Sequence, residues 1–122
     1  MINGIHHVSF LTDDLARARA FYEGVLGLQL NTGRPTLNFD GVWYDAGKGQ
    51  QIHLMVLPDV EKGLLRPDHG GRDRHVAFKV ESMAKLAARL DQAGIAYTLS
   101  QSGRGALFCR DPDQNALEFT AD

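Results

Sequence analysis

Polar and apolar side chains alternate in several short stretches of the chain, and this period of two is typical of a half-buried β-strand. Two longer stretches instead repeat apolar residues every three or four positions, which predicts amphipathic helices. The helices are expected to begin after the N-cap residues Asp14 and Ser82 and to end before Gly27 and Gly94. Strands are expected at 7–10, 28–31, 42–45, 51–57, 75–78, 96–100, 106–110 and 116–120.

The order of these elements repeats once along the chain. The motif His7-Val8-Ser9-Phe10 recurs as His75-Val76-Ala77-Phe78, and a capped helix and three strands follow each copy. The pattern predicts an α+β fold, in which two βαβββ modules form a curved mixed sheet around a metal-binding cavity. Neither module could bury much core alone, so residues 1–122 are expected to be a single domain. Module 1 spans about 1–57, a connector 58–74, and module 2 about 75–122.

Composition narrows the classes of function. The 122 residues carry a formal net charge of −2 with both signs interspersed, which argues against nucleic acid as a partner. No apolar run is long enough to cross a membrane, and no signal peptide is evident. Cys109 is the single cysteine, so a disulfide framework is excluded and a reducing cytoplasm is the expected location. Any metal must therefore be bound by histidine and carboxylate side chains.

Four such side chains occupy equivalent positions in the two modules. In the first and last strand of each module, one face is bulky and apolar, and the other carries a single metal-competent residue among smaller or polar neighbours. These residues are His7, His53, His75 and Glu118. A pseudo-twofold relation between the modules would bring them to one divalent ion, which could be Zn, Ni, Fe, Co or Mn. His6 is expected to point to the opposite face.

The chain resembles the vicinal oxygen chelate (VOC) superfamily, which includes glyoxalase I, extradiol dioxygenases, fosfomycin thiol transferases and methylmalonyl-CoA epimerase. The resemblance covers nearly the whole chain and rests on five stretches: His7 before Asp13-Asp14-Leu15, FYEGVLGL at 21–28, QIHL at 51–54, RHVAF at 74–78 and DPDQNALEF at 111–119. It implies the same four metal ligands. Two departures are His53, where glyoxalase I usually has Glu and the epimerase Gln, and Gln114, where Gly is common.

The resemblance favours a metal-dependent lyase or isomerase of glyoxalase type that acts on a small oxygen-rich substrate. Glu118, the only carboxylate among the four ligands, is then the expected proton carrier. An extradiol-type non-haem iron dioxygenase is the alternative, because His7, His75 and Glu118 form a two-histidine, one-carboxylate set. His53 would occupy a position that O₂ or substrate needs. A resistance protein that sequesters a ligand without turnover is the third possibility.

Residues outside the ligand set are weaker candidates. Trp43 and Tyr44 alternate, so one should face the cavity, although both could equally be core aromatics. Among the arginines, Arg74 and Arg104 are the chosen candidates for binding an anionic substrate group, although exposure to solvent is the default for arginine. A homodimer is expected, with a metal site built either within one chain or from both.

Overall fold

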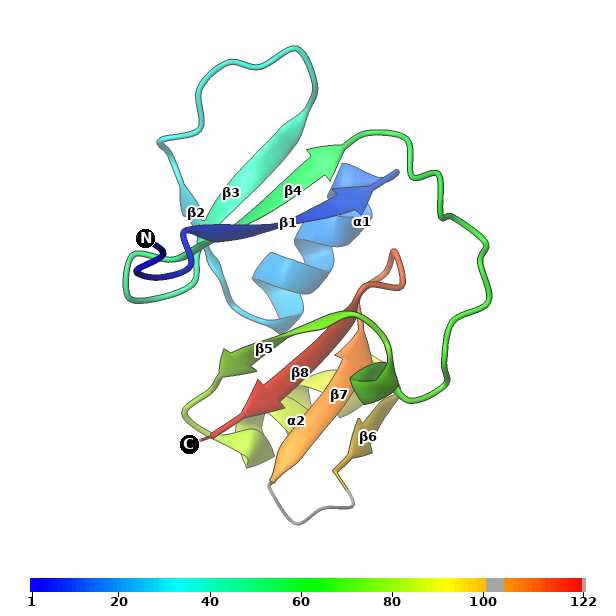
Figure 1. Ribbon diagram of the computed structural model, residues 1–122. Coiled ribbons are helices and arrows are strands. Elements are labelled where there is room, and N and C mark those ends of the chain that lie inside the picture. The colour runs from blue at the N-terminus through cyan, green and yellow to red at the C-terminus, as the bar shows by residue number, and fades with distance from the viewer. Residues whose placement is uncertain (101–104, 122) are drawn as a thin grey trace. The chain divides into compact units, whose positions relative to one another are not determined.

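The computed structural model describes residues 1–100 and 105–121 (Figure 1). The chain divides into two compact units, Met1–Lys62 and Gly63–Asp122. Each unit runs strand, helix and three further strands, and each forms its own four-stranded mixed sheet. The predicted α+β fold with two βαβββ modules is therefore confirmed. The single-domain organisation stays a prediction.

In the first unit, the two ends of the module lie side by side. Its elements are β1 (His7–Thr12), α1 (Leu15–Arg19), η1 (Ala20–Val25), β2 (Gln29–Asn31), β3 (Gly41–Asp45) and β4 (Gln51–Val56). The strand order is β1-β4-β3-β2, with β1 parallel to β4 and the other pairs antiparallel. The first and last strands thus share one hydrogen-bonded ladder, which brings residues far apart in sequence to the same patch of sheet.

The first helix begins as expected. The Asp14 carboxylate accepts a hydrogen bond from the Arg17 amide at 3.0 Å, which satisfies an otherwise unpaired donor. After five residues the α-helix widens into the π-helical segment η1, a change that the sequence pattern did not predict. The chain then leaves the helix at Gly27, whose φ of +73° suits glycine.

The second unit repeats this arrangement. Its elements are η2 (Gly70–Arg72), β5 (His75–Lys79), α2 (Met83–Gln92), β6 (Tyr97–Leu99), β7 (Ala106–Arg110) and β8 (Ala116–Thr120). The strand order is β5-β8-β7-β6, and β5 is parallel to β8. The Ser82 side chain caps α2 by accepting from the Lys85 amide, and Gly94 at φ +70° follows the helix.

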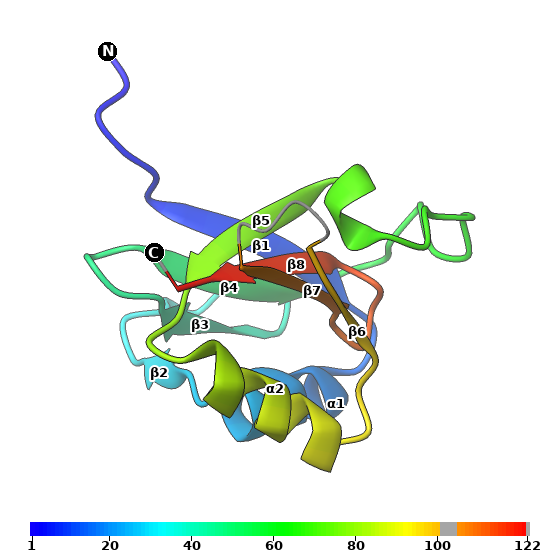
Figure 2. The same cartoon turned by 90° about the horizontal axis from the view of Figure 1, so that it is seen from below.

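In each unit the helix covers one face of its own sheet (Figure 2). In the first unit, Tyr22 packs between Phe10 of β1 and Tyr44 of β3, with ring centroids 6.2 and 6.0 Å apart. In the second, Leu86 and Leu90 of α2 are buried, as are Leu117 and Phe119 on the apolar face of β8. These contacts assign the apolar strand faces to the cores, and the opposite faces carry the candidate ligands. Among the described residues, no helix is long and apolar enough to span a bilayer.

Candidate functional site

The first unit brings His7 and His53 together on the sheet face opposite the helix. In the β1–β4 ladder His7 pairs with Gln51, and Ser9 pairs with His53. Paired residues in a ladder point to the same side, so both imidazoles share one face. Their rings stack with centroids 4.0 Å apart and planes inclined by 12°. The facing predicted from the alternation of apolar and polar residues is thus correct for this pair.

Trp43 lies on the other side of His53. It pairs with His53 in the β3–β4 ladder, and the two rings stack at 4.1 Å with only 3° between their planes. Tyr44 instead points into the core, where it is fully buried and its hydroxyl donates to Glu23 at 2.7 Å. Of the two aromatic candidates, Trp43 is therefore the one beside the histidines.

The expectation for His6 was wrong. Its Nδ1 lies 2.8 Å from Nδ1 of His7, and the ring centroids are 5.1 Å apart. The reason is that β1 begins at His7, so His6 precedes the strand and does not follow its alternation. His7 therefore contacts two other imidazoles, His6 edge-on and His53 by stacking.

His53 is held as a neutral imidazole. Burial, together with the neighbouring His7, His6 and Arg34, lowers the pKa of His53 to about 4. Its Nε2 lies 2.8 Å from the amide oxygen of Gln51, which can only accept, so Nε2 carries the hydrogen in this arrangement. A neutral imidazole keeps one lone pair free, which is the form that binds a metal.

The second unit brings His75 and Glu118 together. Ala77 of β5 pairs with Glu118 of β8, so His75 lies diagonally across the ladder on the same face. His75 Nε2 lies 3.1 Å from Glu118 Oε1. Only 7% of Glu118 is exposed, and Phe108 of β7 pairs with it directly. The same Phe108 ring meets His75 edge-on at 5.8 Å, so an apolar wall flanks the polar pair.

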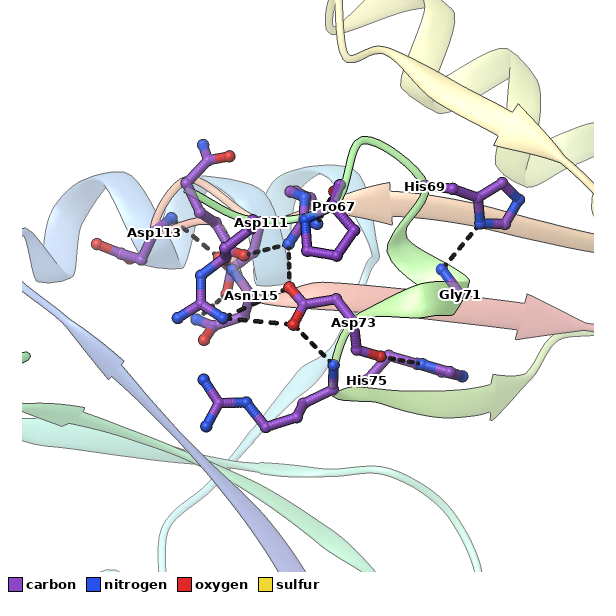
Figure 3. Close-up of polar contacts among 12 residues, drawn as sticks. Pro67, His69, Gly71, Asp73, His75, Asp111, Asp113 and Asn115 are labelled. Carbon is purple, nitrogen blue, oxygen red and sulfur yellow. Dashed lines mark hydrogen bonds and ion pairs between the residues drawn. The ribbon is translucent and has the colours of Figure 1, made fainter. Parts of the chain in front are cut away.

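The other ring nitrogen of His75 has a defined partner. Nδ1 lies 2.8 Å from the main-chain carbonyl oxygen of Asp73, the residue two positions earlier (Figure 3). The Asp73 carboxylate accepts from Arg110 Nη1 at 2.9 Å and from the Arg74 amide at 2.8 Å. The hydrogen bond from Arg110 is the main reason that the pKa of the Asp73 carboxyl lies below its usual range. Asp73 is thus a fixed anion at the start of β5.

The donor chemistry of these residues fits a divalent cation. Two ligand atoms that each lie about 2.1 Å from one ion are roughly 3.0–3.4 Å apart, and the separation of His75 Nε2 and Glu118 Oε1 falls in that span. Imidazole and carboxylate donors suit Zn, Fe, Ni, Co or Mn. Among residues 1–100 and 105–121, no three potential ligands form a single cluster, and each unit contributes one pair. Convergence of both pairs on one ion stays a prediction.

The two arginines predicted to bind an anionic substrate group are less well placed than the metal-competent residues. Arg74 is exposed at the start of β5, and Arg104 lies outside the described residues. Sequence reasoning missed the roles of Gln51, Asp73 and Arg110. The only signal for Gln51 was its place two residues before His53 on the same strand face. Asp73 and Arg110 are 37 residues apart, and no periodicity indicates their pairing.

Comparison with known proteins bears on the whole chain. Residues 4–119 match the model of the Glyoxalase/Bleomycin resistance protein/Dioxygenase superfamily. The chain is 33% identical to Glyoxylase I 4 of Arabidopsis thaliana over 97% of its length and 70% of that protein. It is 28% identical to the metallothiol transferase FosB of Shouchella clausii over 97% of its length and 80% of that protein.

A solved structure shares the fold at lower identity. It is the E126Q mutant of the fosfomycin resistance protein FosX from Listeria monocytogenes, complexed with Mn(II) and 1S,2S-dihydroxypropylphosphonic acid. It superposes with a TM-score of 0.75 at 17% identity, covering 99% of this chain and 93% of that one. The match of the superfamily model to residues 4–119 shows that the chain belongs to the Glyoxalase/Bleomycin resistance protein/Dioxygenase superfamily.

Proposed function

We propose that this chain is a metal-dependent enzyme of the glyoxalase-like lyase or isomerase type, acting on a small oxygen-rich substrate. One observation carries the proposal. Each unit presents a pair of metal-competent side chains on its first and last strands, at the sheet face opposite its helix. His7 and His53 form one pair, with rings stacked at 4.0 Å, and His75 and Glu118 form the other, 3.1 Å apart.

In the proposed site His7, His53, His75 and Glu118 hold one divalent ion. When bound, the ion supplies a Lewis acid that stabilises negative charge on adjacent substrate oxygens. The identity of the ion is left among Zn, Ni, Fe, Co and Mn, which all accept this donor set. In the FosX complex, Mn(II) and a dihydroxypropylphosphonic acid are bound by a protein of the same fold, which supports a small oxygen-rich ligand here.

Glu118 is the proposed proton carrier. Glu118 is the one carboxylate in the set. It is buried beside Phe108, and this burial keeps bulk water away from it. A carboxylate placed next to the substrate can take a proton from carbon and return it at a neighbouring position. Trp43, stacked on His53, and the cationic Arg74 and Arg104 are proposed as substrate contacts.

The metal itself separates the leading proposal from the alternatives. His7, His75 and Glu118 alone would suit non-haem iron and O₂, and the family includes dioxygenases. Elemental analysis of untagged protein distinguishes the two, since iron together with O₂ consumption would favour the dioxygenase. Nickel, zinc or cobalt would favour the lyase or isomerase. Tight ligand binding without turnover by the metal-loaded protein would instead favour a sequestering role.

Metal titration tests the ligand set. Isothermal titration of metal-free protein with Zn²⁺ should give one ion per chain, and His7→Ala, His53→Ala, His75→Ala and Glu118→Ala should each weaken binding by at least tenfold. His6→Ala, at the exposed position ahead of β1, should change the affinity far less than His7→Ala. Loss of binding in His6→Ala with retention in His7→Ala would reverse the assignment. Retention of full affinity in all four variants would refute the site.

The proposal extends to assembly and location. Since isologous twofold dimers are the commonest oligomers, we propose a homodimer. A cytoplasmic location is consistent with a single free cysteine, because free thiols persist in a reducing compartment.

A further inference from the structure

A cation of the first unit, Arg34, lies in the loop that joins β2 to β3 in Figure 1. Its side chain is half-buried, and its Nη2 would lie only 3.3 Å from a Cβ built on Gly41, the residue that begins β3. Trp43, two positions further along β3, stacks on His53. After burial and the two neighbouring imidazoles, the charge of Arg34 is the next cause of the low pKa of His53. The guanidinium therefore belongs to the surroundings of this proposed metal ligand.

Contacts within the loop hold the guanidinium in place. Arg34 Nη2 donates to the main-chain carbonyl of Phe39 at 2.7 Å, and the guanidinium carbon lies 5.5 Å from the centroid of the Phe39 ring. The loop itself is tied at its first end by Asn31. The Asn31 side chain accepts from the Gly33 amide at 2.7 Å and donates to the Asp45 carboxylate at 2.8 Å. A cation that is already ordered loses little conformational freedom when it binds a ligand.

Arg34 keeps most of its donors for another molecule. A guanidinium has five N–H groups, and the Phe39 carbonyl takes one of them. Within residues 1–100 and 105–121, no carboxylate forms an ion pair or hydrogen bond with Arg34. Asp40, the acidic residue of the loop, instead accepts from the Gly41 amide at 2.9 Å. A shallow cavity of about 560 Å³, lined by residues 34–40, leaves room for a ligand group beside the cation.

We propose that Arg34 binds an anionic group of the substrate, a carboxylate or a phosphate, while neighbouring oxygens of the same molecule reach the metal. The inference rests on the proposed function and narrows its substrate to small oxygen-rich anions. A guanidinium matches either group through two parallel hydrogen bonds, and charge-assisted bonds of this kind typically contribute about 10- to 100-fold to affinity. Arg34 is thus a specificity-determining residue, in addition to Arg74 and Arg104, and takes no part in proton transfer.

Two ligands that differ only in charge test the proposal on Zn²⁺-loaded protein. Dihydroxyacetone and dihydroxyacetone phosphate share a hydroxyketone end, and NMR titration measures the affinity of each. Wild-type protein should bind the phosphate ester at least about tenfold more tightly. Arg34→Met keeps an aliphatic side chain but removes every donor, and it should weaken binding of the ester by about 10- to 100-fold while leaving dihydroxyacetone unchanged. Arg34→Lys, which keeps the charge without the forked donors, should retain only part of the preference.

A matched control is Arg17→Met, which removes the Arg17–Asp13 ion pair at 3.0 Å in the same unit and should change neither affinity. Equal weakening of both ligands in Arg34→Met would mean that Arg34 only supports the loop, and that result would overturn the proposal. An unchanged preference for the ester in Arg34→Met would overturn it as well. So would a preference that is lost in Arg74→Met and kept in Arg34→Met.

A second titration needs no metal. Metal-free protein is titrated with methylphosphonate and, separately, with acetate, while NMR follows the Arg34 Nε–H and the Trp43 indole N–H signals. At least one anion should shift these signals in a saturable way in wild type and not in Arg34→Met, and the tighter of the two identifies the preferred group. No saturable shift with either anion would overturn the inference. Failure of wild-type protein to bind Zn²⁺ would instead refute the proposed function, and this titration would still decide the role of Arg34.

Discussion

Glu118 lies directly across the β7–β8 ladder from Phe108, so the carboxylate shares its sheet face with a buried aromatic ring. Because the carboxylate is buried, few water molecules can reach it to form hydrogen bonds. Its oxygen Oε1 is 3.1 Å from His75, where a cation or a proton is stabilised by both groups.

Glu118→Gln should reduce turnover far more than metal affinity. The amide can still offer an oxygen to a metal, but it cannot accept and return a proton, so a loss of about 10²–10⁴-fold in rate is expected. The rate can be followed as metal-dependent exchange of the α-protons of dihydroxyacetone with D₂O by proton NMR. Glu81→Gln, at an exposed carboxylate after β5, is the matched control and should change neither quantity. Equal losses of rate and affinity would make Glu118 a structural ligand only.

Cys109 should be unreactive in the folded protein. Burial, aided by the nearby Asp111 carboxylate, raises the pKa of its thiol from 9.0 to about 12, and the thiolate is the reactive form. Ellman's reagent at pH 8 should therefore label the thiol only slowly until denaturant is added. Rapid labelling of native protein would show that the side chain is accessible.

The same pKa shift predicts a dependence of stability on pH. The unfolded chain releases the thiol proton near pH 9, whereas the folded chain retains it until about pH 12. Stability from the buried neutral thiol is therefore complete below pH 9 and is lost as pH rises from 9 toward 12. Since tyrosines and lysines also titrate there, the informative quantity is the difference between wild type and Cys109→Ala in the free energy of unfolding. That difference should shrink with rising pH, and a constant difference would contradict the prediction.

Leu90 and Leu99 give a matched pair for the second core. Leu90 of α2 is fully buried, and Leu90→Ala should cost about 2–5 kcal/mol of the free energy of unfolding. Leu99 of β6 is 59% exposed, and Leu99→Ala should cost at most about 0.5 kcal/mol. Urea denaturation of both variants measures the difference. Similar costs would mean that the apolar face of α2 does not form the core.

A mixing experiment tests whether the metal site draws on two chains. His7→Ala and Glu118→Ala proteins, each inactive alone, are combined after mild dissociation and reassociation. If the two ligand pairs of a site come from different chains, each heterodimer has one intact site, and random mixing should restore roughly a quarter of wild-type activity. Sites built within one chain should restore none. A monomer by light scattering at micromolar concentration would refute the homodimer itself.

Much of the fold could be predicted because its signals are local. The alternation in 7–10 and 75–78 assigned each strand its buried face, and Asp14 and Ser82 capped the helices where the pattern began. The facing of His7, His53, His75 and Glu118 followed from the same alternation, since a strand side chain has only two directions available. The repeat supplied the order of elements in the second unit.

What could not be predicted depends on geometry outside regular strands or on distant partners. His6 precedes β1, so its ring contact with His7 follows the local backbone and no period. The choice of Asp73 and Gln114 as partners of Arg110 depends on how a loop folds back on a sheet edge. Several arginines in the sequence were equally plausible, and only the folded unit distinguishes the part-buried Arg110 from the exposed ones.

Among the described residues, every strand ladder begins and ends inside one unit, because β1 pairs with β4 and β5 pairs with β8. An exchange of units between two copies of the chain would therefore break no main-chain hydrogen bond of either sheet. Evolution can thus rearrange which halves meet by changing the length or sequence of the segment between β4 and β5. The cost of such a rearrangement falls on that one segment, while both sheets and their ligand pairs are inherited intact.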